Sequence, residues 1–191
     1  MKRVMTILTE NFSDWEIALT NSVGRGYYGF ETRFATPGGA PVTSSSGMLV
    51  TPHLAIEDIT LDSFDLLIVC GGTIWQTHKA PDISELLLAA HKKNIVVAGI
   101  CDGTRVLAQA GLLDHLRHTS NSAENLSQLN YAGAAYYQNV PYAVADRHVV
   151  TAPGTAPVSF MVEVFGALGI ERDENFNYYL SMYAAEHNKT A

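Results

Sequence analysis

Short, almost wholly apolar runs alternate with stretches of helical spacing, and this alternation constrains the fold more than any other feature. The apolar runs are residues 4–8, 65–70 and 94–100. Runs of this length without polar alternation are typical of strands buried on both faces. Apolar residues at helical spacing follow them, at residues 12–23, 83–91 and 104–113. The pattern predicts an α/β fold, a three-layer sandwich with helices on both faces of a mostly parallel sheet.

The rest of the chain predicts further elements of the same kind. In the first helix, the spacing of Phe12, Trp15, Leu19 and Val23 predicts the buried face. We expect a strand at 30–35, a turn at 44–47 between two short extended pieces, extended segments near 118–120 and 148–152, and helices at 158–168 and 174–185. In open parallel sheets the ligand binds at the carboxyl ends of the strands.

The composition limits the class of protein and its partners. A chain of 191 residues suits a single domain, 1–191, and an apolar content of 47% supplies a sizeable core. The net charge of −7, without a basic run, argues against binding nucleic acid or an anionic membrane surface. Neither a membrane span nor a signal peptide is evident, and two cysteines cannot build a disulfide scaffold. We therefore expect a cytoplasmic protein.

The segment 99–103, Gly-Ile-Cys-Asp-Gly, lies between a predicted strand and a predicted helix. It has the pattern of a nucleophile elbow with cysteine as the nucleophile. The flanking glycines permit the tight turn, and the thiol of Cys101 would lie at a helix N-terminus, which favours a thiolate. The alternative is a buried cysteine followed by Asp102 as a helix cap.

Asp102 itself has two open interpretations. Its carboxylate caps the following helix, or it points into a pocket and raises the pKa of the neighbouring thiol. Arg105, one turn further on, either offsets that charge or is solvated.

Four motifs, in this order, resemble the ThiJ/PfpI superfamily, which has the class I glutamine-amidotransferase-like (flavodoxin-like) fold. They are residues 12–16 (FSDWE), Gly71-Gly72 after a strand, residues 99–103 (GICDG) and residues 117–121 (RHTSN). The resemblance runs from residue 1 to about residue 170 and includes relatives of the parkinsonism-associated deglycase and of intracellular protease/amidase. It implies a cysteine nucleophile, no cofactor and a homodimer.

The resemblance also implies roles for individual residues. Glu16 is similar to the family's acidic partner of the nucleophile, with a raised pKa; spacing alone also allows a solvent-facing residue. The backbone N–H groups of Gly72 and Asp102 would form an oxyanion hole. Cys70 stands where the family usually has proline, and we interpret it as a small buried strand residue.

Departures from the family pattern narrow the chemistry. Some members carry a histidine after the nucleophile or at the end of a later strand, where this chain has Asp102 and Asn121. A Cys-His dyad for amide hydrolysis therefore lacks its usual base. Asn121, His118, His78 and Trp75 are candidates for lining a pocket, the histidines being otherwise surface or packing residues. No spacing indicates a metal site.

Three functions remain after these observations. The leading one is a cofactor-independent hydrolase or lyase whose Cys101 attacks a small carbonyl or amide substrate, with glyoxalase-, hydratase- or amidase-like chemistry; the missing histidine favours aldehydes. The second is a redox-responsive stress-protection protein in which Cys101 is oxidised to sulfenic or sulfinic acid. The third is a small-molecule-sensing domain without catalysis.

Overall fold

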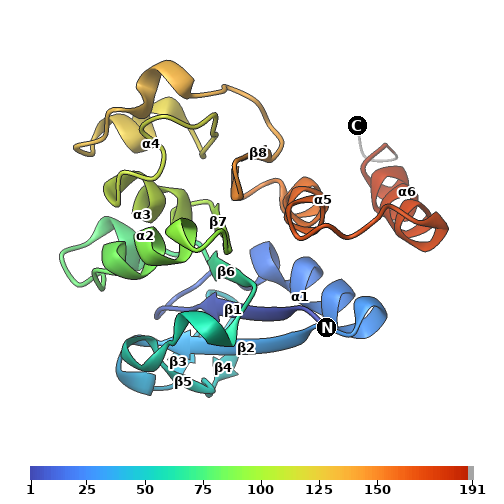
Figure 1. Ribbon diagram of the computed structural model, residues 1–191, viewed down its shortest axis with the longest axis horizontal. Coiled ribbons are helices and arrows are strands. Elements are labelled where there is room, and N and C mark those ends of the chain that lie inside the picture. Colours follow the sequence, from blue (N-terminus) through green and yellow to red (C-terminus); the bar gives the residue numbers. More distant parts are fainter. Residues whose placement is uncertain (189–191) are drawn as a thin grey trace.

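A computed structural model describes residues 1–188. Seven strands form one sheet in the order β5-β2-β1-β6-β7-β9-β8, and β3 and β4 form a separate hairpin (Figure 1). The strands are β1 (Arg3–Ile7), β2 (Glu31–Thr36), β3 (Val42–Thr43), β4 (Leu49–Val50), β5 (Leu54–Ala55), β6 (Leu66–Val69), β7 (Val96–Ile100), β8 (Val144–Asp146) and β9 (Val149–Ala152). The helices are α1 (Asp14–Tyr28), α2 (Ser84–Lys92), α3 (Gly103–Gln109), α4 (Ala123–Ser127), α5 (Pro157–Ala167) and α6 (Glu174–Asn188).

The sheet is parallel except for β8, which pairs antiparallel with β9. Side chains of the central strands alternate between two cores: Leu66 and Ile68 of β6 face the core of α1 and α5, and Leu67 and Val69 face that of α2 and α3. Helices therefore cover both faces (Figure 1). The predicted three-layer α/β sandwich is confirmed. Within residues 1–188, no helix has both the length and the apolar character needed to cross a membrane.

The buried face of α1 differs from the prediction. Trp15 is 53% exposed and Leu19 only partly buried, whereas Ile17, Thr20 and Val23 are buried. The buried face instead includes Glu16, which has no exposed surface and accepts a hydrogen bond from the N–H of Gly71 after β6. A spacing pattern that counts only apolar residues assigns the interior to Trp15 instead.

The segment after α3 also differs from the prediction. Residues 118–120 form no strand, and His118 makes one isolated bridge with Tyr137. The edge strand β8, which the apolar pattern did not indicate, is joined to β9 by Arg147 and His148, both with positive φ. Such a two-residue turn normally carries Asn or Gly, so the sequence gives a poor hairpin signal there.

Candidate active site

Cys101 lies directly after β7, at the carboxyl edge of the sheet, and α3 begins two residues later. Its φ of 56° is in the left-handed region, which a side chain other than glycine rarely adopts. Its N–H donates to the carbonyl of Ala152 at 2.9 Å. Gly103 packs so closely on the carbonyl of Val69 that a Cβ has no room. The segment thus has the strand–turn–helix geometry of an elbow, and the thiol is partly exposed.

Glu16 is fully buried beside Cys101, which excludes the solvent-facing interpretation. Its Oε2 accepts a hydrogen bond from the N–H of Gly71 at 2.9 Å, while Oε1 has no hydrogen-bond partner within residues 1–188. Gly71 and Gly154 pack against both residues, and a Cβ on either glycine would lie about 3 Å or less from the Glu16 carboxyl group and from Cys101. Two glycine backbones therefore enclose the carboxyl–thiol pair.

Burial dominates the acid–base behaviour of the pair. It raises the pKa of Glu16 from 4.5 to about 7, against the lowering effect of the neighbouring Cys101 thiol and the Gly71 N–H. Burial and, after it, the negative charge of Glu16 raise the pKa of Cys101 to about 12. Both effects oppose the thiolate that the helix N-terminus is expected to favour, so the charge state of Cys101 stays a prediction. Burial therefore favours the neutral form of both side chains, which lie side by side between the two glycines.

Asn121 contacts the sulfur from the other side of the elbow. Its Nδ2 donates to Sγ of Cys101 at 3.2 Å, and its Oδ1 accepts from the N–H of Gly154 at 2.9 Å. The second hydrogen bond fixes the amide so that its donor faces the sulfur. Asn121 can therefore stabilise a developing thiolate, but it cannot take up the thiol proton.

Asp102 does not cap α3: its side chain makes no capping hydrogen bond. Its Oδ2 accepts from Nε2 of Gln76 at 2.7 Å, and its charge contributes to the raised pKa of both Glu16 and Cys101. Arg105 neither offsets this charge nor lies in solvent. It is buried and donates to the side-chain oxygen of Asn125 at 3.0 Å.

The two backbone donors that the resemblance assigns to an oxyanion hole lie beside the elbow. Gly72 follows β6, the strand next to β7, and Asp102 follows the nucleophile. Among the described residues, neither N–H makes a recorded intramolecular hydrogen bond. Their assignment to an oxyanion hole stays a prediction.

Three of the candidate pocket residues have other surroundings. Trp75 is 3% exposed and packs in the core. His118 is fully buried, with ring nitrogens against the carbonyl of Leu116 and the hydroxyl of Tyr131, so it is a packing residue. His78 is exposed on the loop before α2.

Trp15, by contrast, lies beside the site: its Nε1 donates to the carbonyl of Gly154 at 3.2 Å. The apolar-spacing argument had assigned it to the core.

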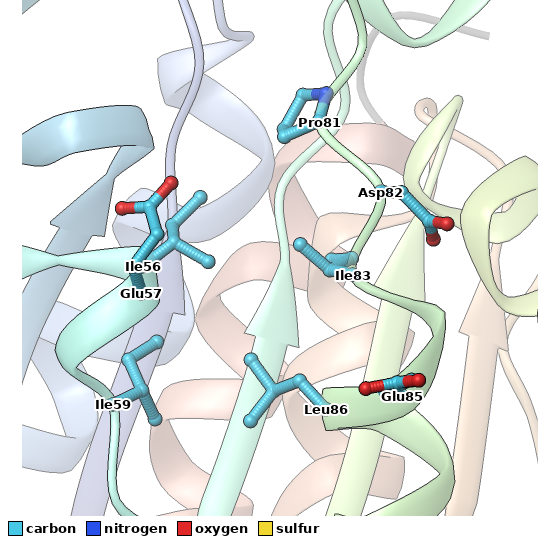
Figure 2. A pocket seen from close by; sticks show the side chains of 8 residues that line it. All are labelled: Ile56, Glu57, Ile59, Pro81, Asp82, Ile83, Glu85 and Leu86. Atoms are coloured by element: carbon cyan, nitrogen blue, oxygen red, sulfur yellow. The ribbon is translucent and has the colours of Figure 1, made fainter.

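A separate cavity of about 440 Å³ lies between the segment after β5 and the start of α2 (Figure 2). Its apolar walls carry three carboxylates; it is lined by Ile56, Glu57, Ile59, Pro81, Asp82, Ile83, Glu85 and Leu86. Two of the carboxylates accept local backbone hydrogen bonds, Glu57 from Gly38 and Asp82 from Ser84. The cavity includes no residue of the Cys101–Glu16 site.

Residues 1–188 also contain no group of three or more His, Cys, Asp or Glu suited to a metal ion.

The fold and the elbow define a class of α/β proteins with a cysteine at the carboxyl edge of a parallel sheet. A family model described as the DJ-1/PfpI family matches residues 2–167, and the chain belongs to that family. This confirms the ThiJ/PfpI resemblance.

Individual relatives agree with this membership. The crystal structure of the DJ-1 superfamily protein Atu0886 from Agrobacterium tumefaciens is 38% identical, with a TM-score of 0.94 over 98% of this chain and 100% of that one. YoaZ of Bacillus subtilis, named an uncharacterized protease, is 35% identical over 68% of this chain and 62% of its own length. DJR-1.2 of Caenorhabditis elegans, named a glutathione-independent glyoxalase, is 29% identical over 54% of this chain and 56% of its own length. The chain thus spans less than two thirds of the length of each of these two curated relatives.

Proposed function

We propose that this protein is a cofactor-independent cysteine enzyme that converts small 2-oxoaldehydes to 2-hydroxy acids. The observation that carries the proposal is the pair of Cys101 and Glu16 enclosed by two glycines, in which burial raises the pKa of the carboxyl group to about 7. A base whose pKa is close to the working pH is the most effective proton acceptor for general catalysis. The glyoxalase name of the relative from Caenorhabditis elegans supports the choice of substrate class.

The reaction begins with addition of the sulfur to the aldehyde carbon. Sγ of Cys101 forms a bond to that carbon while its proton passes to Glu16. The N–H groups of Gly72 and Asp102 hold the carbonyl oxygen as it becomes negative, and the Asn121 amide supports the sulfur as it loses its proton. Protonation of the oxygen by Glu16 gives a hemithioacetal and returns the carboxylate.

The same carboxylate then moves the remaining proton. Glu16 takes the hydrogen from the former aldehyde carbon and delivers it to the neighbouring ketone carbon through an enediol. The hydroxyl proton of the hemithioacetal passes to the former ketone oxygen, which leaves a 2-hydroxy thioester on Cys101. Water cleaves the thioester, releases the 2-hydroxy acid and restores the thiol. The net change is addition of one water to the 2-oxoaldehyde, without an external oxidant or reductant.

Peptide or amide cleavage is less well supported by this site. An amine leaving group needs a proton donor, and His118, the histidine nearest in sequence to Asn121, is engaged in packing. The redox alternative needs a thiolate, which the raised pKa of Cys101 disfavours. We further propose that the enzyme acts in the cytoplasm as a homodimer on small molecules, without nucleic acid or membrane partners.

The test is to supply purified protein with methylglyoxal in the absence of glutathione and to identify the product by NMR. We expect lactate as the product. Lack of turnover, together with oxidation of Cys101 at low peroxide, would support the redox function instead. Lack of both, with saturable binding of a small carbonyl, would support the sensing function.

A further inference from the structure

The chain has two tryptophans, and they lie in opposite environments. Trp15 is 53% exposed on the first turn of α1, and Trp75 is 3% exposed on the loop after β6. Both nevertheless make the same kind of contact, in which the indole N–H donates to a backbone carbonyl. Trp15 donates to Gly154 at 3.2 Å and Trp75 donates to Cys70 at 2.8 Å.

Both carbonyls belong to the backbone that encloses Glu16. The carbonyl of Cys70 shares a peptide group with the N–H of Gly71, which donates to Oε2 of Glu16 at 2.9 Å. The carbonyl of Gly154 belongs to the glycine that packs against Oε1 of Glu16 and Sγ of Cys101. Each tryptophan therefore holds one of the two glycine segments in place.

We propose that Trp15 and Trp75 are positioning residues that fix the glycine backbones at 154 and 71 on the Cys101–Glu16 pair. The reaction that this positioning would serve rests on the proposed function. The positioning itself does not, because it is argued from the contacts that join the tryptophans to the pair. Neither tryptophan is required to touch substrate.

The two contacts have opposite effects on Glu16. The Trp75 hydrogen bond polarises the Cys70–Gly71 peptide and strengthens the hydrogen bond from Gly71 to Oε2, which favours the charged carboxylate. The Trp15 hydrogen bond keeps Gly154 against the carboxyl group and excludes water, which favours the neutral form. A purely structural role for the tryptophans does not predict effects of opposite sign.

Titratable groups from two further elements act on the same carboxyl group. Cys70 lies at the end of β6, and Cys101 and Asp102 lie at the elbow; on α1 itself, Asp14 is the neighbouring acid. Burial and the charge of Glu16 raise the pKa of Cys70 well above its ordinary value, so its thiol stays neutral. The Trp→Phe substitutions leave all of these titratable groups in place, so a shift in the pKa of Glu16 reports the loss of the tryptophan contact.

The experiment is a pH titration of Glu16 by carbon NMR, in wild-type protein and in Trp15→Phe and Trp75→Phe. We expect the midpoint to fall by roughly half a unit to one unit in Trp15→Phe, since one hydrogen bond is lost and water enters. In Trp75→Phe we expect the midpoint to rise by a few tenths of a unit. Polarisation of the Cys70–Gly71 peptide supplies only a fraction of the strength of the hydrogen bond from Gly71 to Glu16. Tyr142→Phe, at a ring that is 54% exposed, is the matched control and leaves the midpoint unchanged.

The midpoints also separate this proposal from the proposed reaction. Because titration needs no turnover, opposite shifts in a protein that does not convert methylglyoxal would support the positioning role and contradict the reaction. Unchanged midpoints, or shifts in the same direction, would overturn the positioning role even if lactate forms. If Trp75→Phe fails to fold, Trp15→Phe decides alone, since its ring is largely outside the core: an unchanged or raised midpoint overturns the proposal.

Discussion

The two cysteines of this protein lie at the same edge of the sheet and have contrasting environments. β6 and β7 are adjacent and parallel, so Cys70 and Cys101 follow directly after neighbouring strand ends. Cys70 is 1% exposed, and its thiol donates to the carbonyl of Ser13 at 3.4 Å. Cys101 is partly exposed and accepts a hydrogen bond from Asn121. One thiol faces a backbone carbonyl, whereas the other lies between a carboxyl group and an amide donor.

This difference shows what makes a cysteine competent as a nucleophile in this fold. A thiol against a carbonyl must keep its proton to make the contact, whereas a sulfur against an amide donor is stabilised as it becomes negative. The backbone decides between the two settings, because the positive φ of Cys101 turns its side chain out of the strand direction. The proximity of Glu16 then provides Cys101 with a proton acceptor.

The largest expected effect comes from replacing the sulfur of Cys101 with oxygen. We expect Cys101→Ser to lower the rate of methylglyoxal conversion at least about a thousandfold, because the hydroxyl is a far weaker nucleophile. Cys70→Ser, the matched control, keeps a rate near that of wild type. Equal losses in both variants, measured as lactate formation, would contradict the division of roles between the cysteines.

Removing the proton acceptor is expected to have the next largest effect. Glu16→Gln keeps the shape of the side chain and its contact with the Gly71 N–H, but it cannot accept the thiol proton. We expect kcat to fall about a hundred- to a thousandfold. Alkylation of Cys101 by iodoacetamide is the accompanying measurement, and its pH midpoint is expected to fall, because the negative charge beside the sulfur is gone. An unchanged kcat would exclude Glu16 as the base.

Glu16 also makes folding stability depend on pH. Its pKa is raised from 4.5 to about 7 in the folded protein, so the folded state binds more protons than the unfolded state between these values. The stabilisation is present below the lower value and is lost as the pH rises through the upper one, a change of about 3 kcal/mol. Urea unfolding at about pH 4 and about pH 8 measures it. The Glu16→Gln variant lacks this contribution, so its free energy of unfolding is expected to change less between the two pH values. An equal change in both proteins would refute the raised pKa of Glu16.

The smallest expected effect concerns the donor that distinguishes the two sulfurs. Asn121→Ala removes one hydrogen bond to Sγ, and we expect kcat/KM for methylglyoxal to fall about tenfold. Asn121→Asp keeps an acceptor for the Gly154 N–H but places a carboxylate beside the sulfur, so a larger loss is expected. If Asn121→Asp is as active as wild type, the amide does not support the developing thiolate.

Much of the fold and part of the site could be predicted from local patterns. The apolar runs identified β1, β6 and β7, and glycines on both sides of Cys101 indicated the elbow, because both features depend on neighbours in sequence. Glu16 was found through a motif resemblance rather than through spacing, which placed it at the margin of an apolar face. The core position predicted for Trp15 is wrong for the same reason. Apolar spacing does not allow for a buried carboxyl group, so it predicts that Trp15 rather than Glu16 faces the interior.

Local residue patterns are sufficient to predict the layered α/β architecture, the elbow at Cys101 and the lack of a histidine next to it. The tertiary structure decided which distant groups surround the thiol: Trp15, Asn121 and Gly154 meet there because β9 enters the sheet beside β7. It also places Asp102 against Gln76 and buries Cys101 so that the pKa of its thiol is raised. Burial and hydrogen-bond direction are properties of three-dimensional neighbours, and residue spacing along the chain does not specify them.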